Sequence, residues 1–143
     1  MTTIRTATAA SATSTTGAPT MSSLAKAGLA AVAVASCATT TIAAAGSAAG
    51  ISLDVAGQPI PVLGFGTLTA MFSVVGLVLA AILARTVRHP RSAFVRTTLV
   101  LTALSLVPDL IADAGWATRA LLMLTHLVAA AIVIPAVARS LRA

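Results

Sequence analysis

The sequence predicts an all-α fold, a four-helix transmembrane bundle with short loops, and three observations lead to this class. Of its 143 residues, 58% are hydrophobic and only 8% are charged, whereas a soluble domain has about 45–50% apolar and about 25% charged residues. The apolar residues fall into four runs, and the basic residues gather at the ends of these runs. Because a transmembrane helix needs about 20 apolar residues, a chain of this length has room for four spans at most, within a single domain.

The amino-terminal segment differs from the rest of the chain. Residues 1–22 are mainly Thr, Ser and Ala, with Gly17 and Pro19, and they show neither a helical nor a strand period. This composition is typical of a disordered segment, so we expect a tail over 1–22 and an integral membrane domain over 23–143. A start of translation at Met21 rather than Met1 is an open alternative, and it removes most of the tail.

The first predicted span covers about residues 27–49, which carry no charge and make a helix of about 35 Å. Its residues are small, and small residues let helix backbones approach closely. Gly46 and Gly50 form a GxxxG motif, which is typical of a dimerisation face. Because the whole run is rich in Ala, packing inside the protein's own bundle is the favoured interpretation of this motif.

Cys37 is the only cysteine, so the chain cannot form an intramolecular disulfide. The residues before it, Val34-Ala35-Ser36, fit the processing box of a bacterial lipoprotein, in which Cys37 is lipidated and the first span is removed. However, the chain stays apolar over 38–51, where a lipoprotein usually has a polar tether. A retained first span is therefore favoured, and the lipoprotein is a weaker alternative.

The second predicted span covers about 60–84, after a short loop over 51–59, and Pro61 suits the first turn of its helix. The segment that follows, 85–96, reads RTVRHPRSAFVR and contains four arginines. Within it, Pro90 is expected to break the helix and help form a turn. Since loops rich in Lys and Arg stay in the cytoplasm, we expect this segment to be cytoplasmic.

The third and fourth predicted spans cover about 97–114 and 117–138, and a turn at Gly115 and Trp116 joins them. Trp suits the interface between membrane and water, which agrees with a turn at this point. Pro108 removes one backbone donor and is expected to kink the third span.

Four spans with the 85–96 segment in the cytoplasm place both termini in the cytoplasm as well. Eight of the nine basic residues then lie on the cytoplasmic side, only Arg119 lies outside, and the three Asp residues fall in the outer half. An excess of Lys and Arg on cytoplasmic loops sets the orientation of membrane proteins. The formal net charge of +6 is therefore interpreted as a topology signal in a bacterial plasma membrane, not as a surface for nucleic acid.

Polar groups within a membrane are costly, so each is a candidate for function. Asp113 and Arg119 flank the predicted outer turn, and we expect them to form an interfacial ion pair. Ion pairs near solvent contribute only about 0–1 kcal/mol, so a structural clasp is the favoured interpretation of this pair.

A second candidate is a polar cluster between the third and fourth spans. Ser105, Asp109 and Asp113 recur every fourth residue and so share one face of the third span. Counted from the turn, His126 lies at the depth of Ser105, with Asp109 about one helical turn away. A buried structural hydrogen bond is the favoured interpretation. A proton relay or ligand site is the alternative, because His titrates near neutral pH and intramembrane Asp and His occur in transporters.

Catalytic and metal sites are not predicted. Ser, Asp and His are the residue types of a hydrolase triad, but the sequence has no GxSxG nucleophile elbow, so no catalytic residue is assigned. The Cys and His spacing of a metal site is also missing, so neither a metal nor another cofactor is expected.

Three segments carry a resemblance to a known family: ISLDVAGQPIPVLGFGTLTA (51–70), HPRSAFVRTTLVLTALSLVPDLIADA (89–114) and TRALLMLTHLVAAAIVIPAVAR (118–139). Their most specific stretches, SLVPD and LTHLVAA, contain Ser105, Asp109 and His126. The chain resembles domain of unknown function sixty sixty-nine, a family of small four-span membrane proteins found mainly in high-GC Gram-positive bacteria. The resemblance implies a retained first span, and it implies no substrate, cofactor or catalytic residue.

Together these observations predict a non-enzymatic, multi-pass membrane protein that acts by helix–helix interaction within the lipid bilayer. Its expected partner is a second copy of the chain or another membrane protein. The alternative is a small transporter or proton-linked channel component that uses Asp109 and His126. A membrane-embedded enzyme is a third and weaker alternative.

Overall fold

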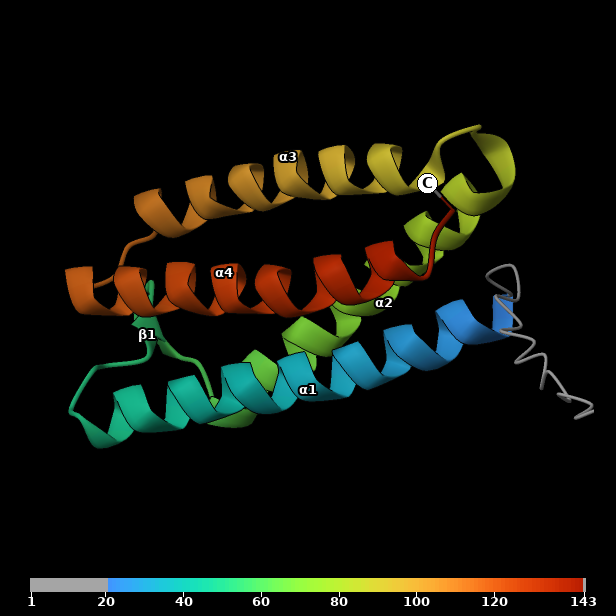
Figure 1. Cartoon of the computed structure of the whole chain (residues 1–143). Helices are drawn as coiled ribbons and strands as arrows, with labels where there is room; N and C mark the ends of the chain where they lie inside the picture. The colour runs from blue at the N-terminus through green and yellow to red at the C-terminus, as the bar shows by residue number, and fades with distance from the viewer. Residues whose placement is uncertain (1–20, 143) are drawn as a thin grey trace, which may run out of the picture.

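Four antiparallel helices make up the structure, a computed structural model in which residues 21–142 are described (Figure 1). In chain order the helices are α1 (Met21–Ala48), α2 (Val62–Thr86), α3 (Pro90–Ile111) and α4 (Trp116–Arg139). All four are long and apolar enough to cross a membrane. The shortest, α3, has 22 residues and is about 33 Å long, which matches a hydrocarbon core of about 30 Å. The predicted all-α class with four candidate spans is confirmed.

Two helices extend beyond the predicted spans at their amino ends. α1 includes Met21 and Ser22, so these two residues of the predicted tail are helical, and the remainder of the tail lies outside the described residues. α3 begins at Pro90, because a proline suits the first position of a helix, where its missing N–H has no intrahelical acceptor. At its other end α3 stops at Ile111, since Ala112 has an extended backbone with a ψ of 140°.

α1 ends in a Schellman motif around Gly50. Gly50 has a φ of +82°, a conformation that favours glycine because it has no Cβ. Its N–H donates to the Ser47 carbonyl at 3.0 Å, and the N–H of Ile51 donates to the Gly46 carbonyl at 2.9 Å. Gly50 therefore lies beyond the helix, and the GxxxG motif does not form one continuous helix face.

A stripe of small residues along α1 packs against the neighbouring helices. Its buried members recur every three or four residues: Leu24, Gly28, Ala31, Ala35, Thr39, Ala43 and Gly46. A side chain added at Gly28 would collide with Leu77 of α2, and one at Gly46 would collide with Leu121 of α4. Packing inside the protein's own bundle, the favoured interpretation of Gly46, is confirmed.

The helices form a bundle in which α4 lies between α1 and α3 (Figure 1). α1 packs against α2 and α4, whereas α3 packs against α4 and less extensively against α2. α3 buries few side chains, namely Pro90, Phe94 and Asp109. It is therefore the helix with the largest share of its surface turned away from the bundle.

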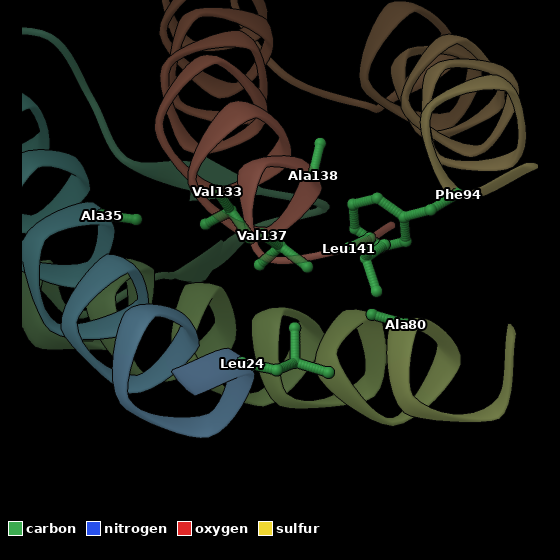
Figure 2. Packing of buried hydrophobic residues seen from close by; sticks show 8 residues of the cluster. All are labelled: Leu24, Ala35, Ala80, Phe94, Val133, Val137, Ala138 and Leu141. Atoms are coloured by element: carbon green, nitrogen blue, oxygen red, sulfur yellow. The ribbon is translucent and has the colours of Figure 1, made fainter. Parts of the chain in front are cut away.

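Two clusters of buried apolar side chains form the core. In Figure 2, side chains from all four helices and from Leu141 converge in the larger cluster: Leu24, Ala35, Ala80, Phe94, Val133, Val137, Ala138 and Leu141. The smaller cluster consists of Ala43, Leu53, Phe65 and Leu121. Between the clusters, Thr39 Oγ1 of α1 and Thr69 Oγ1 of α2 share a hydrogen bond of 2.9 Å, so the middle of this interface is polar.

The predicted loop over 51–59 contains a small antiparallel hairpin, β1 (Asp54–Val55) and β2 (Gln58–Pro59). Its turn residues, Ala56 and Gly57, have φ values of 51° and 73°, as a type I′ turn requires. The N–H of Ala56 donates to the Asp113 carbonyl at 2.8 Å. The hairpin is thus fastened to the α3–α4 turn and caps that end of the bundle.

The charges separate between the two ends of the bundle. The end that holds the start of α1, the α2–α3 turn and the end of α4 is called the basic end, and it carries Lys26, Arg85, Arg88, Arg91, Arg96, Arg139 and Arg142. The opposite end, called the hairpin end, carries the other charged side chains of residues 21–142: Asp54, Asp109, Asp113 and Arg119. Between the ends the outer surface is apolar, with side chains such as Phe72 and Val75 exposed by 69% and 64%. This distribution suits a helix bundle surrounded by lipid.

Candidate functional site

α3 and α4 bring Asp109 and His126 together within the apolar part of the bundle. Asp109 Oδ2 lies 2.7 Å from His126 Nδ1, the only contact of ion-pair distance among residues 21–142. Asp109 is 8% exposed, so its carboxyl group is largely removed from the surroundings of the bundle. Of the predicted polar cluster, the structure therefore joins these two residues directly.

The direction of the side chains explains why His126 meets Asp109 and not Ser105. Side chains on a helix lean toward its amino terminus, and α3 and α4 run in opposite directions. His126 therefore leans toward the hairpin end, while Asp109 leans toward the basic end, and the two meet although their Cα atoms start at different depths. Counting residues from the turn, which favoured Ser105, takes no account of this lean.

Ser105 has a different partner within its own helix. Its Oγ donates to the Thr102 carbonyl at 2.7 Å, and Thr102 Oγ1 in turn donates to the Thr98 carbonyl at 2.8 Å. Hydroxyls of this kind often satisfy a carbonyl of the preceding turn. Ser105 is therefore part of the hydrogen bonding of α3, and it makes no hydrogen bond to Asp109 or His126.

The two ring nitrogens of His126 differ in their hydrogen bonding. Its Nδ1 also lies 3.1 Å from the Leu122 carbonyl, one turn earlier in α4, so Asp109 and this carbonyl share the same nitrogen. The side chain is 39% exposed, and within residues 21–142 its Nε2 has no hydrogen-bond partner. A proton on Nδ1 leaves Nε2 as an acceptor in the neutral ring and as a donor in the charged ring.

The predicted ion pair between Asp113 and Arg119 is not formed among the described residues. Arg119 Nη1 donates instead to the Leu110 carbonyl at 3.3 Å, one of the carbonyls that the end of α3 leaves without an intrahelical donor. Asp113 lies beyond the end of α3, so it does not share a helix face with Ser105 and Asp109. Its carbonyl accepts the hydrogen bond from Ala56 of the hairpin.

Thr118 makes a contact that the sequence analysis did not predict. Its side chain is buried, and its Oγ1 donates to the Ser52 carbonyl. The α3–α4 turn thus holds the hairpin through the Asp113 carbonyl and through Thr118. No short motif predicts a contact between residues so far apart in the chain, because it depends on how the hairpin packs.

The chemistry available at the Asp109–His126 pair is proton exchange and hydrogen bonding. Within the described range 21–142 there is no group of three or more residues that could hold a metal ion. Two cavities of the bundle lie elsewhere, one at the basic end and one on the outer surface of α2 around Met71 and Phe72.

These features define a class: a multi-pass helical membrane protein with an acid–base pair between two of its spans. The chain belongs to the family of unknown function DUF6069, whose model matches residues 19–143. This confirms the resemblance seen in the sequence, and the match includes all of α1. No curated protein and no solved structure matches the chain.

Proposed function

We propose that this protein acts by helix–helix association within the membrane, through the surface formed by α3 and α4. The observation that carries the proposal is the position of His126. Its side chain is 39% exposed near the middle of a helix long enough to span the bilayer. A polar group that faces hydrocarbon is costly, and a hydrogen bond to a neighbouring protein molecule removes that cost.

The packing of the other helices supports the choice of this surface. α1 directs its small residues into the bundle, so its stripe is already occupied. α3 buries only Pro90, Phe94 and Asp109 and exposes apolar side chains such as Leu104 and Val107. A partner that covers α3 and the adjacent part of α4 would bury these side chains and reach Nε2 of His126.

The experiment measures self-association of fluorescently labelled protein in lipid vesicles as the ratio of lipid to protein increases. The test variant is Asp109→Asn with His126→Leu, which removes the carboxyl group and the imidazole ring at once. Hydrogen bonds between transmembrane helices are worth about 0.6–2 kcal/mol, so we expect the association constant to fall about threefold to thirtyfold. Thr41→Val, at an exposed position of α1, is the control and should leave association unchanged. Equal association of all three proteins would contradict the proposal.

Proton-linked transport is a second candidate, favoured by the 2.7 Å contact between Asp109 and His126. Coupled Asp and His side chains are a common form of proton relay in membrane pumps and transporters. The test is dissipation of a pH gradient by reconstituted vesicles, with Asp109→Asn and His126→Ala as variants. A flux in the wild type that a stably folded variant lacks supports transport, whereas a wild type without flux removes this candidate.

A further inference from the structure

A cavity opens at the basic end, where the start of α1, the end of α2, the start of α3 and residues 140–142 meet. Its volume is about 140 Å³, close to the space that four or five water molecules take at about 30 Å³ each. Met21, Leu24 and Leu141 form an apolar part of its lining, and Pro90, Ser140 and Arg142 also line it. Figure 2 shows Leu141 pointing toward Ala80, with Leu24 of α1 on the same side of the cluster.

The chain beyond α4 is held in place at this cavity. The N–H of Arg91 donates to the Arg142 carbonyl at 3.2 Å, and the N–H of Leu141 donates to the Ala138 carbonyl at 3.2 Å. Leu141 is 6% exposed, which anchors the segment in the core. The backbone of Arg142 is therefore fixed at the start of α3, and Arg142 is the charged residue of the cavity lining.

The positive charge around the cavity has no counter-charge within residues 21–142. None of the seven Lys and Arg side chains of the basic end forms an ion pair there, and the three Asp residues belong to the hairpin end. The helices separate the two ends by about 30 Å, which is too far for an ion pair between them. Within the described residues, the basic end therefore presents positive charge that suits an anionic ligand.

We propose that the cavity at the basic end binds the phosphate group of an anionic phospholipid. The lining combines an arginine, whose planar guanidinium group suits phosphate oxygens, with apolar side chains. The cavity lies at the ends of the transmembrane helices, where lipid headgroups are found. Its volume suits a headgroup phosphate and is below the roughly 300 Å³ of pockets that enclose whole ligands. Basic pockets between helix ends bind lipid headgroups in other membrane proteins.

The experiment is native mass spectrometry of the detergent-solubilised protein with phosphatidylglycerol or phosphatidylcholine added at equal concentration. We expect phosphatidylglycerol to be retained preferentially. Arg142→Ala should weaken its binding about fivefold, since one basic residue near a membrane surface contributes about 1 kcal/mol. Ser140→Leu fills the cavity without changing any charge and should weaken binding to a similar extent. The control, Arg96→Ala, removes the same charge from a residue that does not line the cavity, and it should have less than a twofold effect.

Three results would overturn the proposal. If Arg96→Ala weakens binding as much as Arg142→Ala while Ser140→Leu has no effect, the lipid responds to overall charge and the cavity is not a site. If inorganic phosphate alone displaces phosphatidylglycerol at equal concentration, the ligand is a soluble phosphate. If both lipids are retained equally, the cavity does not select anions. Circular dichroism of each variant checks that the helices remain folded. Arg142→Ala removes a charge and Ser140→Leu removes space, so the two variants test the cavity independently.

Discussion

Asp109 Oδ2 and His126 Nδ1 lie 2.7 Å apart, and this contact joins α3 to α4 near the hairpin end of the bundle. α3 makes few other polar contacts with the helices around it. One of them runs from Arg119 to the Leu110 carbonyl. The apolar side chains of α3 face outward along most of the helix. The position of α3 in the bundle therefore depends on the buried carboxylate of Asp109.

The pair predicts strong coupling between substitutions at its two positions. His126→Ala leaves the Asp109 carboxylate buried without a partner, and such a group costs about 1–3 kcal/mol. Asp109→Leu combined with His126→Leu removes both polar groups, so we expect this double variant to be more stable than His126→Ala. The measurement is unfolding by SDS in mixed micelles, followed by circular dichroism and analysed as a double-mutant cycle. Ser105→Ala is the control, and we expect it to change stability by less than about 0.5 kcal/mol. Additive effects at the two positions would show that the contact does not stabilise the fold.

The contact between α1 and α2 depends on a glycine. A Cβ at Gly66 would lie 3.1 Å from the Ser36 carbonyl and would also collide with Thr40. We expect Gly66→Ala to destabilise the protein by about 1–3 kcal/mol, as overpacking does. Gly76 lies on the same helix with nothing within 4 Å of an added Cβ, so Gly76→Ala should be neutral or stabilising. Thermal unfolding in the same detergent compares the two variants, and an equal loss in both would contradict the close approach at Gly66.

The number and approximate place of the spans could be predicted from the sequence, because they depend on apolar length, which each segment carries in itself. The boundaries of α3 were less accurate, since Pro90 can either break a helix or begin one. The Asp109–His126 contact was included in the predicted cluster, but the expected ion pair of Asp113 with Arg119 was not found. That pair depends on where α3 ends, and Ala112 ends the helix before Asp113. Contacts between distant segments, such as Thr118 with Ser52, depend on packing that no local pattern encodes.

The hairpin is expected to depend on Thr118. Thr118→Val removes the donor to the Ser52 carbonyl and leaves that carbonyl without this partner, at a cost of about 1 kcal/mol. We expect residues 54–59 to become more sensitive to limited proteolysis while the helix content stays the same. Thr41→Val removes a hydroxyl that bonds only within its own helix, to the Cys37 carbonyl at 2.8 Å, and should not change the cleavage rate. Equal cleavage of the wild type and Thr118→Val would show that the hairpin is held by its other contacts.

The chemical state of Cys37 distinguishes a protein that retains its first span from a processed lipoprotein. It lies near the middle of α1 and is exposed on the outer surface of that helix, so in a retained span its thiol faces lipid. We expect a charged maleimide to leave Cys37 unlabelled in intact membranes, because a thiol in hydrocarbon is not in contact with the aqueous reagent. The control is Gln58→Cys in a Cys37→Ser background, which places the thiol on the exposed hairpin and should be labelled without disrupting the membrane. Labelling of Gln58→Cys from the extracytoplasmic side also tests the predicted orientation, in which the hairpin end lies outside.

Mass spectrometry of the purified chain completes the test of Cys37, since a chain that begins at a lipidated Cys37 would contradict a four-span protein.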